Sequence, residues 1–227
     1  MDRQRPRPAA PSAREGLPRP KPLGLDGAGR EVLEYIEGRA ATWPWPEALI
    51  AGDGVAQIGG MLRACHRAVA DFAPAEPVSW RDGAGRPSAG EIILHGDFGP
   101  YNLIWREGTL VGAIDWDLAR PGLPIEEAAF AAIHCVPLRP DRVAAAMGFQ
   151  RPPDRRERLI AFARAYGAFA PRELIAEAIE AQARDIARIE RLGGAGLEPW
   201  ATFLASGLAR RTRSERRWLQ RAAADIA

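Results

Sequence analysis

Four residues in the middle of the chain have the types and spacing that phosphoryl transfer requires. His95 and Asp97 flank a glycine, Asn102 follows Asp97 by five residues, and Asp115 follows Asn102 by thirteen. Transfer of a γ-phosphoryl group needs a base that orients the acceptor hydroxyl and oxygen ligands for magnesium. Asp97 supplies a carboxylate for the first task, and Asn102 and Asp115 supply oxygens for the second. The segment therefore predicts magnesium-dependent chemistry on a nucleotide.

The same spacing occurs in the catalytic loop of protein kinases, H-x-D-x-x-x-x-N, with a later aspartate at the end of a strand. This pattern gives Asp97 the position of the catalytic base and makes Asn102 and Asp115 metal ligands. Asp117 is either a further metal ligand or a capping carboxylate, and the two interpretations weigh equally. His95 is included with the catalytic residues, although the pattern favours a histidine that braces the loop backbone, because Asp97 already occupies the position of the base.

Two apolar runs must position this loop. Residues 91–94 and 110–114 have the character of short strands, and residues 105–108 that of a turn. The carboxylates then lie at strand ends. Taken alone, Asp97 and Asn102 would be ordinary turn residues and Asp115 a cap at a strand end. Their joint spacing disfavours that interpretation.

Longer stretches of the sequence resemble the aminoglycoside phosphotransferase and choline kinase superfamily. LHGDFGPYNLIW, GAIDWDLARPG and the run 125–130 are similar to that family's H-G-D-x-x-x-x-N, I-D-W/F-D/E-x-A-x-x-G and D-L/V-A elements. The resemblance implies an α+β, protein-kinase-like fold, with a mainly helical large lobe, a short catalytic β-hairpin and a reduced β remnant of the N-terminal lobe. It also implies ATP or GTP with Mg²⁺ as cofactors, and a small hydroxylated molecule as acceptor. Glu127 stands where the family carries an aspartate, so a supporting role is expected for it.

Upstream, residues 22–26 and 30–38 are similar to the last hairpin of that family's small lobe and to its hinge. A hinge is where backbone groups meet the adenine. The residues that this analogy places there are Glu34, Tyr35 and Ile36. A complete small lobe would also include a strand lysine paired with a helix glutamate. The sequence before the hinge has no room for these parts, and the only lysine, Lys21, lies between prolines.

Three explanations for the short nucleotide lobe stay open: a translation start placed too late, a degraded or frameshifted gene copy, or a second chain that supplies the missing half. The principal functional hypothesis is a small-molecule kinase dependent on Mg²⁺. The first alternative is a pseudoenzyme or small-molecule binding relic that lacks a complete nucleotide lobe. The second is a regulatory protein whose Arg/Pro-rich start docks to a partner.

The sequence suggests three parts: a disordered Pro/Arg-rich tail at 1–20, a remnant of the nucleotide-binding lobe and hinge at 21–52, and a large catalytic lobe at 53–227. Within them we expect a hairpin over 22–38 that turns at 26–29, and a linker without regular structure over 42–46. A helix capped by Asp53 is expected to run to about Val69, followed by a polar loop over 73–90. Further helices are expected at 126–134, 155–169, 172–192 and from about 199 to the C-terminus.

Composition narrows the functional classes. A hydrophobic fraction of 47% and a charged fraction of 26% are ordinary for a globular domain, and a formal charge of +2 is too small to indicate a nucleic-acid partner. Cys65 and Cys135 lack metal-site spacing and are expected to be buried thiols, as in a reducing cytoplasm. Neither a secretion signal nor a membrane-spanning run is recognisable. The sequence does not predict the oligomeric state.

Overall fold

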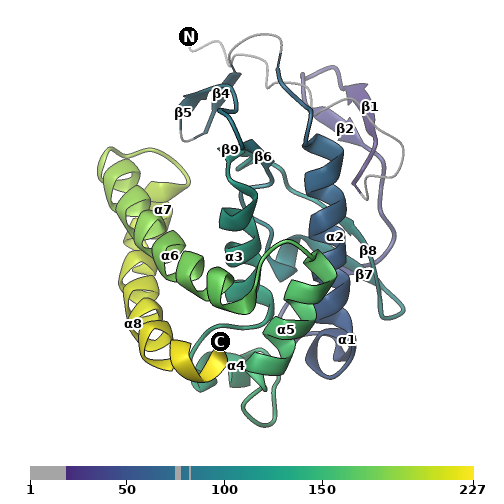
Figure 1. Cartoon of the computed structure of the whole chain (residues 1–227). Helices are drawn as coiled ribbons and strands as arrows, with labels where there is room; N and C mark the ends of the chain where they lie inside the picture. Colours follow the sequence, from purple (N-terminus) through teal and green to yellow (C-terminus); the bar gives the residue numbers. More distant parts are fainter. Residues whose placement is uncertain (1–18, 75–77, 82) are drawn as a thin grey trace.

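The computed structural model describes residues 19–74, 78–81 and 83–227, so the predicted disorder of residues 1–18 lies outside the described residues. Helices surround a few short strands (Figure 1). The helical elements are α1 (Glu47–Ile50), α2 (Gly54–Val69), the 3₁₀ turn η1 (Pro100–Asn102), α3 (Pro124–Cys135), α4 (Asp141–Ala146), α5 (Arg155–Tyr166), α6 (Pro171–Gly194), α7 (Trp200–Ala205) and α8 (Leu208–Ile226). The strands are β1 (Pro22–Leu25), β2 (Glu31–Leu33), β3 (Arg39–Ala40), β4 (Val78–Trp80), β5 (Gly83–Gly85), β6 (Ile92–Leu94), β7 (Leu103–Arg106), β8 (Thr109–Ala113) and β9 (Arg120–Gly122).

The strands form small antiparallel sheets rather than one continuous sheet. In the described residues, β3, β7 and β8 make a three-stranded sheet in that order, and β6 pairs with β9. The two strands predicted at 91–94 and 110–114 are β6 and β8, but they do not pair with each other; the hairpin is β7–β8, and β7 was not predicted. Its turn is tighter than predicted, because Trp105 and Arg106 belong to β7 and only Glu107 and Gly108, both with positive φ, make the reversal.

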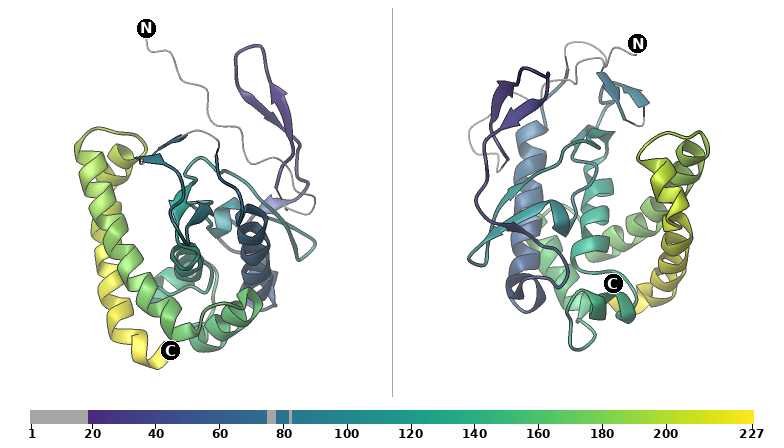
Figure 2. Two further views of the ribbon diagram at one scale, coloured as in Figure 1. Left: turned by 45° about the horizontal axis from the view of Figure 1, so that its top comes forward. Right: turned by 180° about the vertical axis from the view of Figure 1, so that it is seen from behind.

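The helices form two groups with α3 between them (Figures 1 and 2). On one side α2 packs against α5, and on the other α6 packs against α7 and α8. The predicted apolar face of α2 is buried at Val55, Ile58, Leu62, Cys65 and Val69. Because α3 is buried along its alanines and also contacts α6, it joins the two groups into one core.

The structure departs from the predictions in several places. The helix predicted over 155–169 ends at Tyr166, because Gly167 adopts φ 78°. The C-terminal helix is two helices, α7 and α8, because Gly207 adopts φ 74° between them. The predicted polar loop 73–90 contains the β4–β5 ribbon. Asp53 occupies the N-cap position of α2 but makes no capping bond, since its carboxylate accepts from the Gln57 side chain. The short helices α1 and α4 were not predicted.

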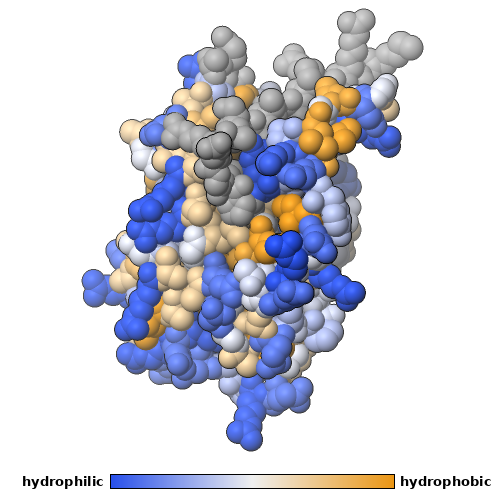
Figure 3. Space-filling view, turned by 90° about the vertical axis from the view of Figure 1, so that its right-hand side faces the viewer, coloured by the Kyte–Doolittle hydropathy of each residue, from blue (hydrophilic) through white to orange (hydrophobic). Residues whose placement is uncertain are grey.

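The β1–β2 hairpin stands out from this core. Its turn is the predicted one, and the Asp26 carboxylate accepts from the backbone N–H groups of Ala28 and Arg30. Each of its strand residues is exposed, including Leu23 at 66% and Leu25 at 71%. Apolar side chains are accordingly visible on the face that carries the hairpin (Figure 3). The hairpin therefore gains little from burial.

Two further sequence predictions concern the cysteines and the membrane. Cys65 and Cys135 are buried and free, as predicted. Among the described residues, no helix has the combined length and apolar character needed to cross a bilayer.

Candidate active site

The loop between β6 and β7 brings Asp97 and Asn102 together. The Asn102 Nδ2 group donates to the Asp97 carbonyl at 2.9 Å and to its Oδ2 at 3.1 Å. The other carboxylate oxygen, Oδ1, accepts from the Tyr101 hydroxyl at 2.5 Å. The η1 turn creates these contacts, because it reverses the chain between Asp97 and β7. With its Nδ2 engaged, Asn102 retains its Oδ1 as an acceptor for a cation.

The pairing of β7 with β8 brings the backbone next to Asp115 into contact with Asn102. The Ile114 N–H donates to the Asn102 carbonyl at 2.9 Å, so Asp115 follows directly after the point where the two segments meet. Asp115 adopts φ 64°, in the left-handed region that non-glycine residues seldom occupy and that is often found at functional sites. Its side chain is exposed, and no hydrogen bond or ion pair of its carboxylate is found within the described part of the chain.

Burial changes the acidity of Asp97. Desolvation raises the pKa of this carboxyl from 3.8 to about 6, although the hydrogen bonds from Tyr101 and Asn102 lower it. The negative charges of Asp115 and Asp185 add to the increase. A carboxyl with a pKa near 6 is ionised at neutral pH and is a stronger base than an exposed aspartate, as suits a general base.

His95 is a buried brace of the loop. Its Nδ1 accepts from the Asp97 N–H at 3.3 Å, so the proton lies on Nε2, which donates to the Ile114 carbonyl at 2.9 Å. Burial lowers the pKa of the imidazole despite the nearby charges of Glu127 and Asp115. Both ring nitrogens are thus occupied by backbone partners. This geometry supports the structural interpretation of His95 over a role in proton transfer.

Glu127 of α3 holds the backbone at the start of the catalytic loop through hydrogen bonds. Its buried carboxylate accepts from the N–H groups of His95 at 3.0 Å and Gly96 at 2.6 Å. It also contacts His66 Nε2 at 2.9 Å, and the Nδ1 of that ring lies 2.8 Å from the Tyr166 hydroxyl. Burial alone would raise the pKa of Glu127, but the hydrogen bonds and the neighbouring imidazoles outweigh it and lower the pKa. The longer side chain at this position therefore supports the loop, as the sequence suggested.

Asp117 is engaged elsewhere. Its carboxylate lies 3.0 Å from Arg81 Nη2 in an ion pair at the surface. Within the described ranges no group of three or more His, Cys, Asp or Glu side chains has the geometry of a metal site. Magnesium needs only one or two protein carboxylates when phosphates supply the other oxygens. Asn102 and Asp115 fit such a site, and Asp117 fits it only after leaving Arg81.

The predicted hinge residues lie between β2 and β3, away from the loop along the chain. The Glu34 N–H donates to the Lys21 carbonyl within the hairpin, Tyr35 is 81% exposed, and Ile36 is partly buried. β3 pairs with β7, so this segment is tied to the sheet that carries Asn102. The side chain of Lys21 is exposed.

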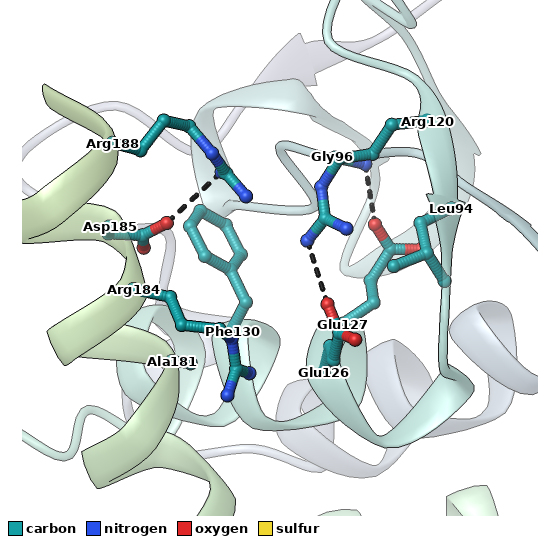
Figure 4. A pocket seen from close by; sticks show the side chains of 10 residues that line it. All are labelled: Leu94, Gly96, Arg120, Glu126, Glu127, Phe130, Ala181, Arg184, Asp185 and Arg188. Carbon is teal, nitrogen blue, oxygen red and sulfur yellow. Dashed lines mark hydrogen bonds and ion pairs between the residues drawn. The ribbon is translucent and has the colours of Figure 1, made fainter. Parts of the chain in front are cut away.

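A cavity of about 30 Å³ lies between the start of the catalytic loop, α3 and α6 (Figure 4). One wall carries Arg120, whose guanidinium bonds Glu126 at 3.0 Å, and the opposite wall carries Asp185 and Arg188 of α6. Burial raises the pKa of Asp185, while Arg188, Arg120 and Arg184 oppose the increase. The space suits one or two waters rather than a substrate.

Sequence reasoning did not single out Tyr101 as a site residue, yet its hydroxyl contacts the predicted base. Tyr101 lies four residues after Asp97, and only the η1 turn folds its ring back onto the carboxylate. The one sequence feature that could have identified Tyr101 as a site residue was its position inside the loop.

Comparisons with known proteins bear on the fold and on the sequence around the loop. The model of a family described as the phosphotransferase enzyme family matches residues 79–174, which include the whole loop, both of its strands and α3. A crystal structure from Ralstonia eutropha JMP134, provisionally described as an aminoglycoside phosphotransferase, superposes with a TM-score of 0.51 at 14% identity, covering 91% of this chain and 79% of that one. The kinase-like α+β fold class is thereby confirmed, as is the predicted family resemblance.

A curated relative is similar over a shorter stretch. The trifolitoxin immunity protein of Rhizobium leguminosarum bv. trifolii is 44% identical over 102 residues. The match covers 43% of this chain and 37% of that protein.

Proposed function

We propose that this chain, which resembles the phosphotransferase enzyme family over residues 79–174, transfers the γ-phosphoryl group of ATP or GTP to a hydroxyl of a small molecule. The observation that supports the proposal is that Asn102 bonds the Asp97 carboxylate, while the residue before Asp115 bonds the Asn102 carbonyl and the charge of Asp115 acts on Asp97. Residues 53–227 are then the catalytic lobe, and residues 21–52 are a reduced nucleotide lobe. The requirement for ATP or GTP implies that the protein acts in the cytoplasm.

Asp97 acts as the base in this proposal. Its carboxylate accepts the proton of the acceptor hydroxyl as that oxygen bonds to the γ-phosphorus. The bond from the γ-phosphorus to the bridging oxygen breaks, and its electron pair leaves with the nucleoside diphosphate. Asn102 keeps the Asp97 carboxylate oriented through its Nδ2 group. His95 and Glu127 hold the backbone that carries it.

Asn102 Oδ1 and the Asp115 carboxylate are the groups that would hold Mg²⁺, with Asp117 as a third ligand once released from Arg81. A bound Mg²⁺ would neutralise charge on the phosphate oxygens. The exposed carboxylate of Asp115, held in a left-handed backbone conformation, supports this assignment. The backbone of residues 34–36 would meet the adenine.

The alternative is a pseudoenzyme that retains the helical lobe without nucleotide turnover. The single lysine favours it: Lys21 lies at the start of the exposed hairpin, and the given sequence contains no second lysine that could contact the α- and β-phosphates. The immunity role in the name of the Rhizobium relative is not transferred to this chain, because the match covers 37% of that protein.

Calorimetric titration with Mg-ATP separates these functions. We expect binding by the wild type and by Asp97→Ala, and weaker binding by Asp115→Ala. The Asp97→Ala variant should lose phosphoryl transfer by about 100-fold or more, as expected for removal of a general base. Asp225→Ala, at an exposed position in α8, is the matched control and should change neither quantity. Absence of binding at millimolar Mg-ATP and Mg-GTP would reject the kinase and leave the binding relic.

A further inference from the structure

A second, larger cavity opens beside the catalytic loop. Its volume is about 280 Å³, which suits a compact ligand of one ring. The linker before α1 forms one wall, the loop forms another, and α3, the segment after it and the end of α4 complete it. The lining residues are Ala41, Thr42, Trp43, Trp45, Pro100, Tyr101, His134, Arg139 and Met147. Trp43 is 55% exposed and Tyr101 42% exposed, so the cavity is open to solvent at these side chains.

The lining is mainly apolar and aromatic. Two indole rings and a phenol ring contribute to the wall, together with Met147. The His134 ring lies 4.3 Å from the Phe130 ring at a tilt of 31°. Burial, followed by the charge of Arg139, holds the pKa of His134 well below the usual value, so the ring is neutral at pH 7. Flat apolar side chains of this kind favour a ring in the ligand.

The charges of the cavity disfavour a cationic ligand. Among the described residues that line it, none is an aspartate or glutamate, and Arg139 is the one permanently charged side chain. Glu215 of α8 lies 3.1 Å from Arg139 Nε and offsets part of this positive charge. An amine placed here would be desolvated next to a guanidinium without a carboxylate in the lining, which costs free energy. A neutral or anionic group avoids that cost.

Trp45 adds a polar group that lacks a partner. The side chain is only 4% exposed, and its Nε1–H has no hydrogen-bond acceptor among the described residues. The nitrogen itself is buried from solvent, so the indole contributes to the cavity as an apolar wall and not through its N–H group. The indole is otherwise held by an edge contact with Phe149 at 5.8 Å.

Tyr101 lies between the cavity and Asp97. The phenol ring lines the cavity, while its hydroxyl donates to Asp97 Oδ1 at 2.5 Å. Asp97 itself is not among the residues that line the cavity, so the phenol ring separates the cavity from the predicted base. Tyr101 must turn aside before a ligand hydroxyl can take its place as donor to that carboxylate.

We propose that this cavity binds the acceptor, and that the acceptor is a compact hydroxylated ring compound without positive charge rather than a polycationic aminoglycoside. The identification of the ligand as the acceptor rests on the proposed function, whereas the binding site itself stands on the cavity. The aromatic walls hold the ring, and the hydroxyl reaches Asp97 once Tyr101 turns aside.

A series of probes that share one skeleton and differ in charge tests the inference without nucleotide. The probes are 4-hydroxybenzoate, 4-hydroxybenzyl alcohol and 4-hydroxybenzylamine, with kanamycin as a polycation. Binding is followed by calorimetry and by the indole N–H signals in ¹⁵N-resolved NMR spectra. We expect the anionic or the neutral probe to bind at least about fivefold more tightly than the amine and kanamycin. The signal missing from Trp45→Phe identifies the Trp45 indole, which should change its chemical shift when an aromatic ligand ring packs against this wall.

Two surface variants locate the binding. Trp43→Ala removes a wall, and Thr42→Trp fills the exposed side of the cavity; each should weaken binding of the preferred probe by about tenfold. Leu197→Ala, an exposed apolar residue on the turn between α6 and α7, is the control and should bind like the wild type. Urea unfolding of each variant verifies that the fold is retained.

The results separate this inference from the proposed kinase activity. Preference for the amine or kanamycin, no binding up to 10 mM (roughly −3 kcal/mol, below any specific affinity), or binding unaffected by both cavity variants would overturn the inference. Loss of nucleotide binding with intact, Trp43-dependent probe binding would overturn the kinase proposal and leave a small-molecule binding protein.

Discussion

At the scale of single residues, two opposing effects act on the pKa of Asp97. Tyr101 and Asn102 donate hydrogen bonds to its carboxylate, which favours the ionised form, yet burial in the loop outweighs them and raises the pKa to about 6. An aspartate used only to cap a turn gains from hydrogen bonds without such a penalty. Perturbed acidity of this kind is frequent at functional sites, where a base must be ionised near neutral pH.

The pH dependence of phosphoryl transfer follows from this pKa. Asp97 accepts a proton only when ionised, so kcat/KM should fall tenfold per pH unit below about 6 and be level above it. Tyr101→Phe removes a hydrogen bond that lowers the pKa, and the acidic limb should then move to higher pH. A pH–rate profile of both proteins checks the prediction. A wild-type limb near pH 4, or an unchanged limb in the variant, would contradict it.

Asp97 should also cost the protein stability at neutral pH. The carboxyl releases its proton near pH 3.8 in the unfolded chain and only near 6 in the folded one, so stability declines as the pH rises between these values. Asp97→Asn carries no charge and avoids the decline. We expect it to be more stable than the wild type by about 1–2 kcal/mol at pH 8, with the difference vanishing at pH 3.5. Urea unfolding at both pH values measures this, and equal gains at both would refute it.

At the scale of elements, the catalytic loop is held by helices that are distant in sequence. Glu127 on α3 accepts from the loop backbone and from His66 on α2, and His66 in turn contacts Tyr166 at the end of α5. Side chains from three helices are thus linked in one chain of contacts that ends at this buried carboxylate. The loop geometry therefore depends on how the helices pack as much as on the loop sequence.

Replacing the Glu127 carboxylate should loosen this arrangement. Glu127→Gln retains the shape, but its amide places a donor against donors, so we expect a loss of about 2–4 kcal/mol of unfolding free energy. Glu190→Gln is the matched control, since Glu190 pairs with Arg213 at the surface, and it should cost less than about 1 kcal/mol. Urea denaturation of both variants is the measurement. Similar losses in the two would show that the buried carboxylate is not a support.

Gly96 is required by the loop backbone. It has φ +83°, and a Cβ there would lie 1.9 Å from the Leu118 carbonyl oxygen. We expect Gly96→Ala to destabilise the fold by at least about 1–3 kcal/mol. Gly60 on α2 has open space around its Cα, so Gly60→Ala should instead stabilise by about 0.5–1 kcal/mol. Thermal unfolding distinguishes the two, and a neutral Gly96→Ala would show that the loop tolerates rearrangement.

At the scale of the whole molecule, stability is unevenly distributed. The helical part has a continuous buried core, whereas the β1–β2 hairpin leaves its strand side chains exposed. An isolated two-stranded hairpin is at best marginally stable in water. The part of the chain expected to meet the nucleotide is thus the part least supported by packing.

Hydrogen exchange should show this contrast. Amides of residues 22–33 should exchange with an opening free energy near zero, while those in the middle of α2 and α6 should exchange only with global unfolding. Native-state exchange followed by NMR measures both. Protection of the hairpin amides equal to that of α2 would show that the hairpin is covered in solution.

Much of the fold and the site was predictable because the relevant signals are local. Asp97 and Asn102 are five residues apart on one loop, so their spacing alone brings them together. The helical periodicity of residues 172–192 predicted α6 to within two residues at each end. Gly207, by contrast, was overlooked as a break in the last helix, because a single glycine is tolerated in many helices and only its positive φ ends this one.

The sequence by itself determined which residues form the loop, the types of its chemical groups and the strand that leads into Asp115. Only the tertiary structure decided that β6 pairs with β9, that Glu127 and His66 support the loop, and that Tyr101 covers Asp97 beside a cavity walled by Trp45. The physical reason is the distance along the chain over which each effect acts. Spacing and periodicity act over a few residues, whereas burial, the pKa of Asp97 and the shape of a cavity arise from segments packed together from distant parts of the chain.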